Sequence, residues 1–139
     1  MAIVYFDSSA FVKLLIEEDG SDVAAALWDG CDAAASSRLA YPEVLAALSA
    51  AVRAHRIDAD EQLRAQAMWE EFWAATRAVE LTDHIAHHAG ELAAAHALRG
   101  ADAIHLASVL AIDDAVFAVW DQRLRTAGQA TGIRLAPSR

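Results

Sequence analysis

The stretch Ile3-Val4-Tyr5-Phe6-Asp7-Ser8-Ser9-Ala10 joins an apolar run to an acidic residue and a helix start. Its first four residues are continuously apolar and rich in β-formers, which predicts a strand. The side chains of Asp7, Ser8 and Ser9 can cap a helix, and we expect that helix over residues 10–17. A strand that leads directly into a helix indicates an α/β fold, in which a parallel sheet is covered by helices.

The rest of the chain repeats this alternation of short strands and longer helices. The expected strands are residues 3–6, 33–36, 79–81, 116–119 and 133–135. The expected helices are residues 10–17, 23–29, 42–56, 61–77, 83–98, 103–111 and 122–127. Together they predict a central parallel sheet of four to five short strands with helices on both faces.

Length and composition favour one domain over the whole chain, residues 1–139. A chain of 139 residues with 56% hydrophobic residues, two Pro and six Gly has the size of one core and no stretch typical of a linker. Apolar runs are too short to span a membrane, and Met1 to Phe6 lacks a basic leader, so we expect a cytoplasmic protein. Cys31 has no partner for an internal disulfide, and we expect it to be a small buried residue.

Four acidic residues are embedded in apolar sequence, namely Asp7, Glu43, Asp102 and Asp121. A carboxylate in an apolar neighbourhood loses several kcal/mol of hydration unless a cation or hydrogen-bond donors meet it. Four of them together predict a bound metal ion, and oxygen ligands favour Mg²⁺, with Mn²⁺ as a substitute. The alternative for each is helix capping, because all four fall at turns or in the first turns of expected helices.

The expected topology brings these acids to one edge of the sheet. Asp7 and Asp121 follow strands, and ligands of such folds bind beyond the carboxyl ends of parallel strands. Asp102 and Glu43 come from helix starts. A metal held there can activate a water molecule for attack on phosphorus and neutralise the departing oxygen, so we expect metal-assisted hydrolysis of a phosphodiester.

The net charge of −9 argues against nucleic-acid binding through bulk electrostatics. It does not exclude a nucleic-acid enzyme, because bound cations would reverse the local potential at the acids. Ten of the eleven basic residues are Arg, which suits forked contacts to phosphate. Arginines close in sequence to the acids are Arg38, Arg99, Arg123 and Arg125.

Four motifs carry a resemblance to a known family. They are Asp7-Ser8-Ser9-Ala10 after a strand, Tyr41 to Leu48 around Glu43, Asp102-Ala103-Ile104-His105-Leu106-Ala107, and Asp121-x-x-Leu124 after a strand. In this order the chain resembles the PIN-domain ribonucleases, and in particular the VapC toxins of type II VapBC toxin-antitoxin pairs. The Asp-Ala-Ile-His-Leu-Ala motif is the most specific of the four.

The resemblance implies a PIN-like fold and a toxin that inhibits growth by cleaving RNA. By this resemblance Asp7, Glu43, Asp102 and Asp121 would bind Mg²⁺ or Mn²⁺ and carry catalysis. The substrate would be single-stranded or structured RNA, and a cognate VapB-type antitoxin would insert a peptide into the groove. The resemblance also implies a homodimer, with DNA contacted only indirectly through the antitoxin and no membrane partner.

One difference from the family concerns the last acid. Family members often carry a hydroxyl residue two positions before it, where this chain has Val119, which cannot hydrogen-bond to Asp121. Asp7 and Asp102 are therefore the most secure of the expected ligands. Further candidates for supporting or phosphate contacts are Ser8, Lys13, Arg38 and Arg123, with helix capping as the alternative for Ser8 and a solvated helix for Lys13.

Several histidines and aromatics have two interpretations. His84 and His88 have a spacing that can bind Zn²⁺, but a solvated helix face is favoured because no His-Glu-x-x-His order is present. His105 lies on the same helical face as Asp102 and is either a general base or, the favoured interpretation, a buried histidine with a hydrogen-bond partner. Trp69, Phe72 and Trp73 follow helical spacing, which favours core or subunit interface over base stacking.

Two other functions stay open at this stage. The chain could be a Mg²⁺-dependent phosphatase or receiver-like domain, although no Asp-x-Asp follows the first strand. It could also be a non-enzymatic acidic helical interaction module, in which the carboxylates only cap helices. We favour the metal-dependent endoribonuclease because capping does not require four acids with a common destination.

Overall fold

A five-stranded parallel sheet is the centre of the molecule in the computed structural model, which describes residues 2–138. Its strand order is β3-β2-β1-β4-β5, and all four neighbouring pairs are parallel. The strands are β1 (Ile3–Phe6), β2 (Ala33–Ser37), β3 (Thr76–Val79), β4 (Ala115–Ala118) and β5 (Arg134–Ala136). The helices are α1 (Ser8–Leu15), α2 (Ser21–Gly30), α3 (Ala40–Arg53), α4 (Ala59–Ala74), α5 (Asp83–His96), α6 (Gly100–Leu110) and α7 (Gln122–Ala130).

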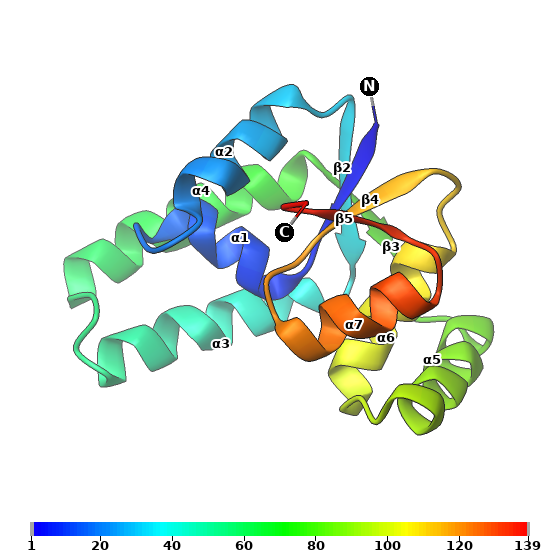
Figure 1. Cartoon of the computed structure of the whole chain (residues 1–139). Coiled ribbons are helices and arrows are strands. Elements are labelled where there is room, and N and C mark those ends of the chain that lie inside the picture. The colour runs from blue at the N-terminus through cyan, green and yellow to red at the C-terminus, as the bar shows by residue number, and fades with distance from the viewer. Residues whose placement is uncertain (1, 139) are drawn as a thin grey trace.

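The helices form two layers, with α1 to α4 on one face of the sheet and α5 to α7 on the other (Figure 1). The alternation of side chains along β1 explains this division. Val4 and Phe6 pack with α1, α3 and α4, whereas Tyr5 points to the opposite face and packs with α6 and α7. Because β1 is the central strand and both its faces are buried, its sequence is continuously apolar.

The aromatic stripe of α4 belongs mainly to the core. Trp69 is fully buried and lies 4.8 Å from Phe11 between ring centroids. Phe72 and Trp73 are partly buried against the same cluster. The favoured interpretation of these residues as core or interface is confirmed for Trp69, and base stacking is excluded for its buried ring.

The predicted fold class is confirmed, but three local predictions were wrong. Residues 76–79 form β3, where the sequence suggested that the preceding helix continues to residue 77 and that the strand covers 79–81. Pairing with β2, from Ala34 opposite Thr76 to Ser37 opposite Val79, sets these bounds. Helix α6 begins at Gly100, three residues before the expected start at residue 103, so Asp102 lies within its first turn instead of capping it.

Two further expectations concern Cys31 and the membrane. Cys31 is half-buried instead of fully buried, and its thiol donates a hydrogen bond to the Trp28 carbonyl at 3.3 Å. Among residues 2–138, no helix has the length and apolar character required to cross a bilayer.

Candidate active site

Asp7 lies at the carboxyl end of β1, where the strand turns into α1. Its Oδ1 accepts the backbone N–H of Ala10 at 2.8 Å and the Ser9 hydroxyl at 3.0 Å, so it is the N-cap of α1. The residue is only 6% exposed. Burial raises the pKa of the Asp7 carboxyl, and Asp102 raises it further, against the lowering effects of His105, Ala10 and Ser9. A buried carboxyl in this state would be stabilised by a cation.

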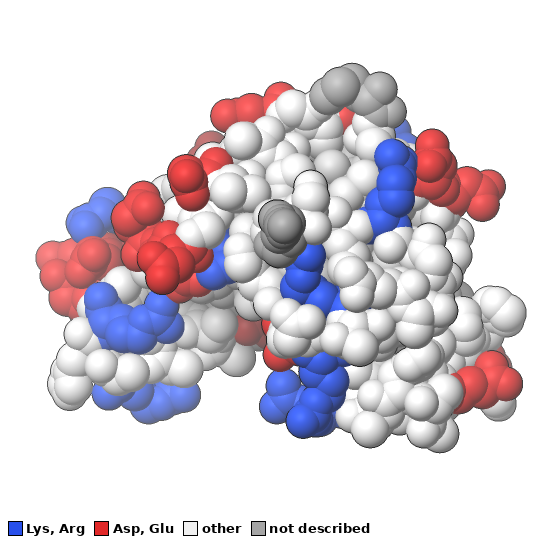
Figure 2. Space-filling view, in the orientation of Figure 1, with Lys and Arg blue, Asp and Glu red and all other residues white. Residues whose placement is uncertain are grey.

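Asp102 and Asp121 line a common cavity of about 400 Å³ at the starts of α6 and α7. Asp102 is half-buried and accepts a hydrogen bond from Arg99 Nε at 3.3 Å. Asp121 is exposed, and its Oδ1 accepts the Leu124 N–H at 2.9 Å as the N-cap of α7. The cavity also contains Arg123, and Figure 2 shows basic side chains gathered where α6 and α7 begin.

Glu43, in the first turn of α3, is held by two side chains from other elements. Its Oε1 lies 2.7 Å from His105 Nε2 and accepts a short hydrogen bond from the Ser8 hydroxyl. Burial favours a higher pKa for Glu43, but the hydrogen bonds from His105 and Ser8 and the electrostatic effect of the nearby His105 ring outweigh it, so the pKa lies below its ordinary value. Glu43 is therefore ionised at neutral pH, as a metal ligand requires.

The acids fall at one end of the sheet but do not form a ready-made cage. Asp7 interacts electrostatically with both Asp102 and His105, and His105 joins it to Glu43. In the part of the chain that the structure describes, no group of three His, Cys, Asp or Glu side chains is arranged closely enough to hold an ion. The donor set is nevertheless all carboxylate oxygen, with a buried Asp7 beside Asp102, and this chemistry fits a hard divalent cation.

The remaining candidate residues divide between this site and other places. Ser8 contacts Glu43 directly, and Arg123 lies in the cavity with Asp102 and Asp121. Lys13 instead donates to Glu18 at 2.9 Å and to the Asp19 carbonyl at 2.7 Å, and lies over the Trp120 ring. Arg38 forms a forked ion pair with Glu80 on the surface.

The segment that precedes Asp121 is held by Arg125, a role that the sequence did not reveal. Arg125 is buried and donates to the Val119 carbonyl and the Pro137 carbonyl, each at 2.7 Å. Val119 itself is fully buried. The backbone before Asp121 is thus fixed by a guanidinium, and the carboxylate by its cap to Leu124, without the hydroxyl that family members often carry.

The favoured interpretation of His105 as a buried, hydrogen-bonded histidine is confirmed. It is 2% exposed, and its Nδ1 lies 2.7 Å from the Tyr5 hydroxyl. The sequence did not single out Tyr5 as a site residue. The sequence nevertheless contained a signal for Tyr5, because a hydroxyl inside an otherwise apolar strand requires a buried hydrogen-bond partner.

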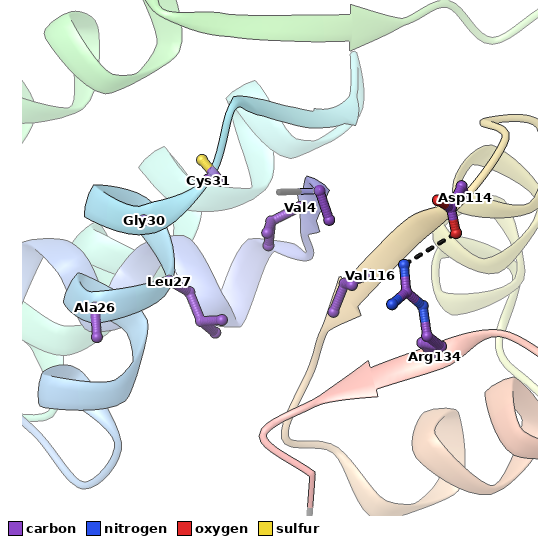
Figure 3. Close-up of a pocket in the computed structure, with 9 residues that line it drawn as sticks. Val4, Ala26, Leu27, Gly30, Cys31, Asp114, Val116 and Arg134 are labelled. Carbon is purple, nitrogen blue, oxygen red and sulfur yellow. Dashed lines mark hydrogen bonds and ion pairs between the residues drawn. The ribbon is translucent and has the colours of Figure 1, made fainter.

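Two other features lie away from the acids. His84 is exposed and His88 half-buried on α5, which supports a solvated face. A cavity of about 530 Å³ lies at the opposite end of the sheet, between α2 and the starts of β1 and β4 (Figure 3). Asp114 and Arg134 form an ion pair at its edge, 3.0 Å apart. None of the four acids lines it, so it is not part of the candidate site.

Comparison with known proteins shows the family of the chain. The family model described as PIN domain matches residues 4–129. Ribonuclease VapC45 of Mycobacterium tuberculosis strain CDC 1551 / Oshkosh and ribonuclease VapC49 of strain ATCC 25618 / H37Rv are each 64% identical to this chain over 140 residues, covering 99% of this chain and 97% of each relative.

A solved structure shows the same fold. The crystal structure of VapBC2 from Rickettsia felis, bound to a DNA fragment from its promoter, contains a chain that matches with a TM-score of 0.66. The match covers 96% of both chains at 12% sequence identity, which shows a common fold. The family model and the two relatives at 64% identity lead to one conclusion: the chain belongs to the PIN-domain family, and within it to the VapC ribonucleases.

Proposed function

We propose that this protein is a metal-dependent endoribonuclease and the toxin of a type II VapBC pair, which inhibits growth by cleaving cellular RNA. The observation that carries the metal dependence is Asp7, a buried carboxyl with a raised pKa beside Asp102 at the carboxyl end of the central strand. Such a group has no evident structural benefit beyond its cap, which Asn would provide equally well. The 64% identity to two proteins named as ribonucleases supports the reaction.

The four acids Asp7, Glu43, Asp102 and Asp121 would hold Mg²⁺, or Mn²⁺ in its place. When bound, the ion supplies Lewis-acid chemistry and lowers the pKa of a water molecule for attack on the phosphodiester. The side chains around it have separate tasks. Ser8 and His105 keep Glu43 ionised and fixed, and Arg125 fixes the segment before Asp121.

Two arginines beside the acids, Arg99 and Arg123, would contact the substrate. Arg99 is 81% exposed and Arg123 is also exposed, and both line the cavity that holds Asp102 and Asp121. In a protein with a net charge of −9, these guanidiniums offer a local contact for the RNA phosphates on either side of the cleaved bond.

The protein partners are a cognate VapB-type antitoxin and a second copy of this chain. The Rickettsia felis structure contains a VapBC2 assembly on promoter DNA, which supports an antitoxin that carries the DNA contact. An exposed apolar groove of about 590 Å³, lined by Leu39, Tyr41, Pro42, Trp73 and Leu81 with Arg38, supports a homodimer contact. A cytoplasmic location is consistent with both partners.

Cleavage of total RNA by the purified protein tests the proposal. We expect cleavage with Mg²⁺ or Mn²⁺, none in chelator, and a loss of at least about 100-fold in Asp7→Asn and Asp102→Asn, because removal of charge at a metal site removes transition-state stabilisation. Asp60→Asn, on the exposed start of α4, is the matched control and should cleave as the wild type does. Undiminished cleavage and growth arrest by Asp7→Asn would contradict the proposal.

A further inference from the structure

A buried chain of hydrogen bonds runs from the backbone of β2 to the carboxylate of Glu43. The Ser37 N–H donates to the Tyr5 hydroxyl oxygen at 3.0 Å. The same hydroxyl lies 2.7 Å from His105 Nδ1, and His105 Nε2 lies 2.7 Å from Glu43 Oε1. Tyr5 is fully buried and His105 is 2% exposed, so water does not compete for these bonds.

The chemistry of the groups gives this chain one direction. The backbone N–H of Ser37 can only donate, so the Tyr5 oxygen accepts it and has its own proton to give. Ser36 and Ser108 also hydrogen-bond to this hydroxyl, and among its neighbours the unprotonated His105 Nδ1, 2.7 Å away, is the strongest acceptor for the proton. A neutral imidazole that accepts at Nδ1 carries its proton on Nε2, and Nε2 faces a carboxylate oxygen that can only accept. The other tautomer, protonated at Nδ1, would place a lone pair of Nε2 against a lone pair of Glu43 Oε1, and the two would repel each other.

These hydrogen bonds fix Oε1 of Glu43 and leave its other oxygen, Oε2, available. Oε1 receives both His105 and the Ser8 hydroxyl, whereas no hydrogen bond within residues 2–138 reaches Oε2. The ring of His105 is buried, with both nitrogens engaged, so it has no access to substrate or to a water molecule. Its effect on the reaction must therefore pass through Glu43.

We infer that His105 is a positioning residue, whose tautomer is set by Tyr5 and which holds Glu43 with Oε1 engaged and Oε2 free for the divalent cation. The inference rests on the proposed function, since it assumes that Glu43 holds a metal ion. Partners that orient a ligand from behind commonly change metal affinity by about 10- to 100-fold when removed.

Tyr5→Phe is the sharpest variant, because it removes only the hydroxyl and keeps the ring that packs edge-on against Phe117. The matched control is Thr76→Val, which removes a half-buried hydroxyl that donates to the Phe72 carbonyl at the start of β3. Thermal unfolding in chelator shows whether each variant is folded. His105→Leu removes the donor to Glu43, and His105→Gln restores an N–H donor without the ring.

The first measurement is the ¹⁵N NMR spectrum of histidine in the metal-free protein at neutral pH, with His105 assigned by its absence in His105→Gln. We expect Nε2 as the donor and Nδ1 as the acceptor in the wild type and in Thr76→Val, and loss of this single arrangement in Tyr5→Phe. A His105 ring protonated on both nitrogens, or one unchanged in Tyr5→Phe, would overturn the inference.

The second measurement is calorimetric titration with Mn²⁺ alone. Mn²⁺ binding should weaken about 10-fold or more in Tyr5→Phe and His105→Leu. The affinity of His105→Gln should lie within a few-fold of the wild type, and the control Thr76→Val should bind as the wild type does. Wild-type affinity for Mn²⁺ in folded Tyr5→Phe and His105→Leu would overturn this inference and leave the proposed function intact. A wild-type protein that neither binds Mn²⁺ nor cleaves RNA would overturn the proposed function, and this inference with it.

Discussion

Asp7 caps a helix, and its carboxylate also has an oxygen available for the metal binding that we propose. Its Oδ1 caps α1, whereas among residues 2–138 its Oδ2 accepts a hydrogen bond only from the Ser9 hydroxyl, at 3.2 Å. The capping alternative and the metal alternative are therefore compatible, since each uses a different part of the carboxylate. The sequence alone presented them as competitors because neither the burial of Asp7 nor its distance from Asp102 can be derived from local pattern.

Asp7→Asn should make the metal-free protein more stable at neutral pH. Burial raises the pKa of Asp7 in the fold above its ordinary value of 3.8, so ionisation begins to reduce the free energy of unfolding as the pH rises above 3.8, and the loss is complete above the folded pKa. That cost vanishes below pH 3.8. The gain from Asn, about 1 to 3 kcal/mol for a buried group that no longer needs a counter-charge, should thus be largest near pH 7 and shrink as the pH falls.

Denaturant unfolding in chelator across pH measures this gain. Asp121→Asn is the control, because Asp121 has the same capping role but is exposed, and its stability difference should stay within about 0.5 kcal/mol. A gain for Asp7→Asn that grew toward low pH would contradict the burial argument.

At the scale of elements, the turn before α2 packs closely against the segment before α7. Gly20, the residue before α2, has a φ of +92°, and a Cβ there would lie 2.9 Å from Trp120 Nε1. Trp120 directly precedes Asp121. The position of the last acid thus depends on a contact with the opposite helical layer, which no local sequence window contains.

Two Gly→Ala substitutions should change the free energy of unfolding in opposite directions. Gly20→Ala should cost about 1 to 2 kcal/mol, because a left-handed backbone and the Trp120 ring both oppose a Cβ. Gly90→Ala, within α5 and with open space at its Cβ, should gain about 0.8 to 1.0 kcal/mol. Thermal unfolding of the two single variants compares them directly, and equal signs would show that Trp120 and the backbone of Gly20 do not restrict the turn.

Arg125 connects α7, β5 and the segment before Asp121. Arg125→Met keeps the aliphatic part of the side chain but leaves the Val119 and Pro137 carbonyls without their donor, so we expect a loss of about 2 to 4 kcal/mol. Arg123→Met, two residues earlier on the exposed side of α7, should change the free energy of unfolding by less than about 0.5 kcal/mol. Equal effects in chemical denaturation would mean that Arg125 does not hold the segment.

For the whole molecule, the sequence predicted the fold well, but it did not predict the contacts within the candidate site. The apolar runs of β1 and β4 are buried on both faces, and this makes them visible as sequence pattern. Strand β3 begins three residues and ends two residues before the predicted strand, because its bounds come from pairing with β2. In the site, the link between Glu43 and His105 joins residues 62 apart in sequence, so only the folded chain shows it.

Divalent metal should stabilise the whole molecule in proportion to its occupancy. At a Mn²⁺ concentration 100 times the dissociation constant, binding adds about 2.7 kcal/mol, which raises Tm by about 10 °C in a domain of this size. Asp7→Asn should lose most of this rise, while Asp60→Asn should keep it. Scanning calorimetry with and without Mn²⁺ makes the comparison, and an equal rise in Asp7→Asn would place the ion elsewhere.

The use of two of the four acids as N-caps has a consequence for inheritance. A codon for Asp becomes a codon for Asn by one nucleotide change, and Asn caps a helix about as well as Asp. At Asp7 or Asp121 such a mutation should abolish the proposed activity and leave the fold intact. A gene of this kind can therefore lose its toxicity in one step while it still encodes a folded protein.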